Sequence, residues 1–164
     1  MRVYLPATLP LLATWSAEGA APAGQAFAVT PGLREWYSDG DSEEMELAAT
    51  VLAGREAIRL LAQDAEAAPR RVVLAVDVSE QDVIVLDAED TGLVRLGGPA
   101  SVERWGAIMV DDVDADTVRI LGRARGLVTQ ADEGDPDADL AVGDADDLDL
   151  LWWGVQEIDA LLQQ

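Results

Sequence analysis

Three aspartates that follow a predicted strand are the residues best placed to do chemistry in this chain. Asp111, Asp112 and Asp114 come directly after an apolar run over 105–110. Carboxylates are the ligands that Mg²⁺ and Ca²⁺ prefer in proteins, so these aspartates form a candidate metal site of a metal-binding protein or a metal-dependent carboxylate enzyme. An aspartate in this position can equally cap the helix that follows and favour its dipole. Both interpretations stay open.

A second set of carboxylates has the spacing of a calcium-binding loop. Asp135, Asp137 and Asp139 occupy alternate positions, and Asp146 stands at the twelfth position of such a loop. The sixth position is Leu140 instead of the glycine that the sharp turn needs, and the twelfth is usually a glutamate. Ca²⁺ binding at these residues is therefore one hypothesis, and a solvated acidic loop is the other.

Three residue types that dominate catalysis are missing, because the chain has no histidine, no cysteine and no lysine. Their absence excludes Ser-His-Asp and cysteine nucleophiles, Cys/His zinc sites, Schiff-base lysines and Walker A lysines. What remains is metal chemistry through oxygen ligands, or a function without chemistry. The missing lysine is explained more simply by a GC-rich genome than by adaptation to salt, and the missing cysteine fits a reducing cytoplasm.

The net charge of the chain limits the classes of partner that it can bind. The 164 residues include 11 arginines and 32 aspartates and glutamates, which gives a net charge of −21. Nucleic acids and anionic membranes need a basic surface, so we expect neither as a partner. One alternative remains: the protein could be an acidic mimic of nucleic acid that binds and blocks a basic partner protein. No segment approaches the roughly 18 apolar residues of a membrane span, so we expect a soluble cytoplasmic protein.

The elements that must position these residues begin with a long helix. Asp41 or Ser42 caps it, and Pro69 follows its end at about residue 67. Apolar residues recur along it at helical spacing: Leu47, Val51, Ile58 and Leu61. Thr8 and Thr30, each close to a proline, predict two shorter helices.

Apolar runs over 1–5, 26–30, 72–76, 83–86, 93–96 and 105–110 predict strands, of which 72–76 is apolar on both faces and therefore central. We expect an α+β fold, a single domain over 1–164. Its central mixed sheet should have about four or five strands packed by two or three main helices. An acidic loop is expected at about 132–146, and a C-terminal helix at about 147–162.

Two adjacent tryptophans lie in that predicted C-terminal helix. Trp152 and Trp153 would point about 100° apart on a helix, so both cannot enter one core. Tryptophan is enriched at the centres of protein interfaces. Trp153 is therefore a candidate interface residue, and core packing is the alternative.

Four segments together resemble an uncharacterised family of small proteins from high-GC actinobacteria. They are Met1–Thr8, Arg70–Asp77, Met109–Asp112, and Leu150–Trp153 with Gln156-Glu157. The resemblance spans nearly the whole chain and implies a cytoplasmic bacterial protein, but it assigns no activity. Many members of that family have a histidine at about the position of Met109, so no histidine-based role transfers to this chain.

The leading hypothesis for function is a non-enzymatic cytoplasmic protein that acts through protein–protein contacts or self-association. It rests on the missing catalytic residue types and on the surplus tryptophan near the C-terminus. A divalent-metal protein with Ca²⁺ or Mg²⁺ at the aspartates above is the first alternative, and the acidic mimic of nucleic acid is the second.

Overall fold

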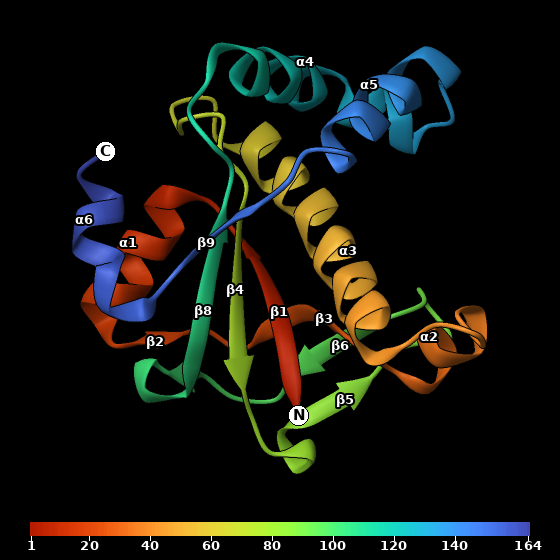
Figure 1. The fold of residues 1–164 in the computed structure, drawn as a ribbon, viewed down its shortest axis with the longest axis vertical. Helices are drawn as coiled ribbons and strands as arrows, with labels where there is room; N and C mark the ends of the chain where they lie inside the picture. Colours follow the sequence, from red (N-terminus) through yellow and green to blue (C-terminus); the bar gives the residue numbers. More distant parts are fainter.

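A computed structural model describes residues 1–164, which form an antiparallel sheet with helices on both faces (Figure 1). The strands are β1 (Arg2–Ala7), β2 (Ala20–Ala21), β3 (Gly24–Ala28), β4 (Val72–Asp77), β5 (Val83–Val85), β6 (Leu93–Leu96), β7 (Ala100–Ser101), β8 (Trp105–Val110) and β9 (Leu151–Trp153). The helices are α1 (Leu9–Glu18), α2 (Pro31–Trp36), α3 (Ser42–Gln63), α4 (Ala115–Asp132), α5 (Pro136–Asp146) and α6 (Ile158–Leu162). Short 3₁₀ turns occupy Glu80–Asp82, Val102–Arg104 and Val155–Glu157.

The main sheet has seven strands in the order β5-β6-β3-β1-β4-β8-β9, and β2 pairs with β7 apart from it. Every pair of neighbouring strands is antiparallel. The α+β class is confirmed, but the expected mixed sheet of four or five strands with two or three main helices is wrong, since there are seven strands and six helices. Edge strands of three residues, such as β9, are too short to show a period of two in the sequence.

Strand β4 lies at the centre of the core, as its apolar sequence predicts. On one face Leu74 and Val76 pack in a cluster with Leu12 and Trp15 of α1. On the other face Val73 packs in a cluster with alanines of α3. The double apolar face of this strand therefore reflects helices on both sides of an antiparallel sheet rather than parallel pairing.

Helix α3 lies close to the sheet because small residues face it. Asp41 caps its N-terminus and forms a capping box with Glu44. Gly54 lies over a buried arginine, and a Cβ added there would stand 3.3 Å from Nη1 of Arg71. The glycine that weakens this helix in isolation thus makes room for a buried guanidinium.

Helices α4 and α5 form a hairpin that packs on the C-terminal half of α3 (Figure 1). Its apolar cluster joins Ile58 of α3 to residues of both hairpin helices, among them Leu121, Val128 and Val142. Ion pairs surround the cluster: Arg59 holds Asp132 through Nε and Nη2, both at 2.8 Å. The hairpin is therefore attached to α3 by apolar burial inside and by arginines at its rim.

The acidic segment 132–146 was expected to be a loop, but residues Pro136–Asp146 form helix α5. Asp135 caps this helix and Pro136 occupies its first turn. The side that packs is made mostly of alanine, at positions Ala138, Ala141 and Ala145. Small inward residues bury little area each and give a weak hydrophobic signal, so nine carboxylates between 132 and 149 dominate the pattern.

The C-terminal helix expected at about 147–162 is also wrong. Residues Leu151–Trp153 form β9, which pairs with β8 at the edge of the sheet, and the helix α6 begins only at Ile158. The apolar residues of this segment fit a helical period, but an open strand edge at β8 offers backbone hydrogen bonds that no local pattern shows. No helix in the structure has the length and apolar character that crossing a membrane requires.

Candidate functional site

The aspartates predicted from the β8 strand end have separate structural roles. Asp111 is fully buried and forms an ion pair with Arg71. Its Oδ1 accepts from Nη2 of Arg71 at 2.7 Å, and its Oδ2 accepts from Nε at 2.9 Å and from the Arg71 backbone N–H at 2.7 Å. Asp112 is exposed and accepts from the N–H of Val113. Asp114 caps α4 through Thr117, whose hydroxyl and N–H donate to it and lower its pKa.

The second predicted set is spread over α5 and its cap. Asp135 accepts from the N–H groups of Asp137 and Ala138 at the start of the helix. Asp139 pairs with Arg55 of α3 at 2.7 Å, and Asp137 is exposed. Nowhere in the structure do three or more aspartates and glutamates gather in a group able to hold a metal ion. Metal binding at either set stays a prediction.

Asp146, the twelfth residue of the expected calcium loop, lies in the contact between α3 and α5. Asp146 accepts from Nη1 of Arg55 at 3.2 Å, while its Oδ1 is buried without a hydrogen-bond partner. Burial raises the pKa of this carboxyl despite the nearby guanidinium. Its role is therefore in the attachment of the hairpin to α3.

The two tryptophans of β9 differ in their surroundings. Trp153 is half-buried and packs against the core on the α1 side of the sheet. Trp152 points to the opposite face of the strand, and its side chain is 66% exposed. The interface role of Trp153 stays a prediction.

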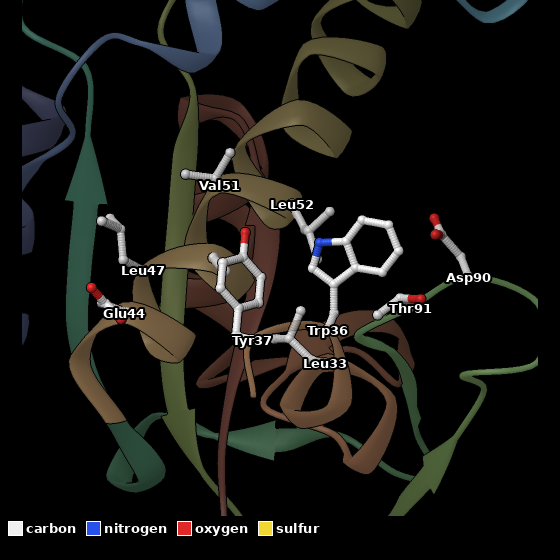
Figure 2. Close-up of a pocket in the computed structure, with 10 residues that line it drawn as sticks. Leu33, Trp36, Tyr37, Glu44, Leu47, Val51, Leu52, Asp90 and Thr91 are labelled. Carbon is white, nitrogen blue, oxygen red and sulfur yellow. The ribbon is translucent and has the colours of Figure 1, made fainter. Parts of the chain in front are cut away.

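A concave surface lies beside α2 and the N-terminal half of α3, and we call it the α2–α3 groove. Its cavity volume is about 550 Å³. Ten residues line it: the hydrophobic Leu33, Trp36, Tyr37, Leu47, Ala48, Val51 and Leu52, and the polar Glu44, Asp90 and Thr91. Figure 2 shows the Trp36 indole between Leu52 and the Asp90–Thr91 segment, with the Tyr37 ring on the side of the indole away from Asp90.

The groove exposes large apolar side chains that a folded protein usually covers. Trp36 is 78% exposed and Leu47 is 64% exposed. Leu47, Val51 and Ile58 are spaced by four and seven residues, so they form one stripe along α3. Its Ile58 end is buried under the α4–α5 hairpin, while its Leu47 end has no cover.

Local sequence explains why α2 presents its aromatic residues outward. Thr30 caps the helix by accepting from the N–H of Leu33, and Pro31 follows in the first turn. Leu33 is buried in the core, so Trp36 and Tyr37 at the end of this short helix project beside α3 (Figure 2). The adjacent aromatic residues Trp36 and Tyr37 are the only signal for the groove in the sequence. Whether their side chains are exposed depends on where α3 lies, which no local pattern shows.

Asp87, which sequence reasoning missed, joins two walls of the groove. Its carboxylate accepts from the hydroxyl of Thr30 at 2.5 Å and from the N–H groups of Gly32 at 2.9 Å and Gly92 at 3.1 Å. Burial acts to raise the pKa of Asp87, but these three hydrogen bonds outweigh it and lower the pKa. Asp87 therefore fixes the start of α2 against the loop that carries Asp90.

Replacing Asp87 with alanine is expected to lower the free energy of unfolding by about 1–3 kcal/mol, because three donors lose their acceptor. Since the folded-state pKa of Asp87 is depressed, its contribution is present above the unfolded pKa and is lost as the pH falls through the folded pKa. The difference in the free energy of unfolding between the wild type and D87A should thus become smaller below about pH 4. Urea unfolding at several pH values measures both effects. Glu89→Ala, an exposed change in the same loop, is the control, and equal stability of D87A and E89A would contradict the role of Asp87.

Comparison with known proteins places the chain in a family without an assigned function. No curated protein and no solved structure matches it. The model of a family of unknown function, DUF6912, matches residues 1–162. Because this match covers nearly the whole chain, the protein belongs to the DUF6912 family.

Proposed function

We propose that this protein acts by binding a partner protein, whose apolar side chains enter the α2–α3 groove. The observation that supports this function is the exposure of Trp36 and Leu47 on two sides of one cavity. Exposed apolar surface is costly in water, and a concentrated patch marks an interaction site more often than scattered single residues do.

The size and composition of the groove fit such a role. Its volume is about 550 Å³, and seven of its ten lining residues are hydrophobic. Tryptophan is strongly enriched among the interface residues that contribute most to the binding free energy. Covering Trp36 would therefore supply a large part of the binding free energy.

Fluorescence anisotropy with a stapled helical peptide tests this function. The probe carries a stripe of leucines and a neutral, glutamine-rich polar face. We expect it to bind the wild-type protein, and we expect Trp36→Ala to weaken binding by about 2 kcal/mol or roughly thirtyfold.

Trp152→Ala is the matched control, because Trp152 is exposed to a similar extent on the distant edge strand β9. Urea unfolding of both variants verifies that they remain folded. Absence of binding to the wild type, or equal weakening by W36A and W152A, would contradict a binding function of the groove.

We also propose that the protein is cytoplasmic and comes from a bacterium with a GC-rich genome, as actinobacteria have. The complete absence of cysteine, lysine and asparagine supports this origin, since lysine and asparagine have A/T-rich codons and disulfides are rare in the cytoplasm.

A further inference from the structure

Resting on the binding function above, we infer that the segment that fills the α2–α3 groove is a basic amphipathic helix of a partner protein. Its apolar face would cover Trp36, Leu47 and Val51, and its lysines or arginines would face the carboxylates at the rim.

The helices that already pack on α3 indicate that the partner segment is also a helix. The stripe that includes Leu47 and Val51 continues to Ile58, where the α4–α5 hairpin covers it with helices. The uncovered part of α3 between Glu44 and Leu52 is about 12 Å long at 1.5 Å per residue, which matches about two turns of a helix lying along it. An amphipathic helix in such a groove presents anchors at positions i, i+3 or i+4, and i+7.

The charge of the partner follows from a difference between the two halves of α3. In the C-terminal half, α3 supplies Arg55 and Arg59, and the hairpin that covers them supplies aspartates. In the groove the signs are reversed: Glu44 and Asp90 line it, and no arginine does. A segment that covers this half with the same complementarity must therefore bring the positive charges itself.

The carboxylates around the groove have no cationic partner within the chain. All seven ion pairs of the structure involve residues outside the groove lining. Three more acidic residues of this part of the chain are exposed: Glu35 of α2, Asp39 between the two helices and Glu43 in the first turn of α3. A second copy of this chain is disfavoured as the occupant, because two proteins with a charge of −21 repel each other.

Three stapled peptides with one leucine stripe and different polar faces test the inference. The faces are rich in lysine, glutamine or glutamate. We expect the lysine peptide to bind about tenfold more tightly than the glutamine peptide at low salt, and the glutamate peptide to bind most weakly. The advantage of the lysine peptide should shrink as the salt concentration rises.

A double variant, Glu44→Gln with Asp90→Asn, should remove most of the preference for lysine, measured as the ratio of the dissociation constants of the glutamine and lysine peptides. Glutamine can replace Glu44 in the capping box, so the helix start is kept. The matched control is Asp147→Asn with Asp149→Asn, which removes the same charge from exposed positions near β9.

The outcomes separate this inference from the binding function. Equal binding of all three peptides, lost in W36A, would overturn the basic partner and leave the function of the groove intact. An equal loss of lysine preference in both double variants would also overturn it, because the preference would then come from overall charge. Absence of binding by every peptide would contradict the function and the inference together.

Discussion

Replacing Asp111 with alanine is expected to lower the free energy of unfolding by about 3–5 kcal/mol, which is the largest effect of any single substitution that we predict. The cause is the arginine that remains. The side chains of Arg71 and Asp111 are 2% and 0% exposed, so the variant leaves a buried guanidinium without its counter-charge. Loss of three hydrogen bonds to the carboxylate adds to the cost.

The position of this pair explains why its loss should affect the whole fold. Arg71 precedes β4, Asp111 follows β8, and the guanidinium lies under Gly54 of α3. Nη2 of Arg71 also donates to the carbonyl of Leu148, which precedes β9. One ion pair thus connects two strands, the long helix and the C-terminal segment.

Urea unfolding followed by tryptophan fluorescence measures the effect. The control is Asp112→Ala, a neighbouring aspartate that is exposed and accepts only from the adjacent N–H of Val113. We expect D112A to stay within about 0.5 kcal/mol of the wild type. Similar stabilities of D111A and D112A would show that the ion pair is not what holds this part of the structure together.

Replacing Ile58 with alanine is the second substitution with a large expected effect, a loss of about 2–5 kcal/mol. Ile58 is fully buried where α3 meets the α4–α5 hairpin, in the cluster with Leu121, Val128 and Val142. The cavity left by three missing carbon atoms would lie at the centre of this contact, so the hairpin should loosen first.

Leu47→Ala is the matched control, because it removes the same number of carbon atoms from the same stripe of the same helix. Leu47 is 64% exposed, so we expect a change within about 0.5 kcal/mol. Urea unfolding measures both variants, and amide hydrogen exchange over residues 115–146 reports on the hairpin. If I58A and L47A had equal effects, or if exchange in the hairpin did not change, the hairpin would not depend on Ile58.

Features that depend on near neighbours could be predicted from the sequence. Thr8, Thr30 and Asp41 cap helices as expected, because each cap bond joins residues three positions apart. Asp114 caps α4, which was one of its two interpretations. The missing residue types likewise limit the available chemistry whatever the fold.

The candidate site could be predicted only in part. The sequence predicts the helix that begins at Thr30 and the long helix with its apolar stripe, and it contains the aromatic pair Trp36-Tyr37, but it does not show which end of the stripe is buried. Whether a residue of an apolar stripe is buried depends on how far the covering element reaches, and the hairpin covers Ile58 without reaching Leu47.

The sequence by itself therefore determined the starts of α1, α2, α3 and α4, the central strand at Val72–Val76 and the restriction to carboxylate chemistry or binding. Only the tertiary structure decided that the acidic segment becomes α5, that Leu151–Trp153 becomes a strand, and that Asp111 forms an ion pair with Arg71. The physical reason is the range of the interactions. A cap bond is made within one turn, whereas an edge strand needs β8 beside it, and a buried charge needs a partner that is 40 residues away in the chain.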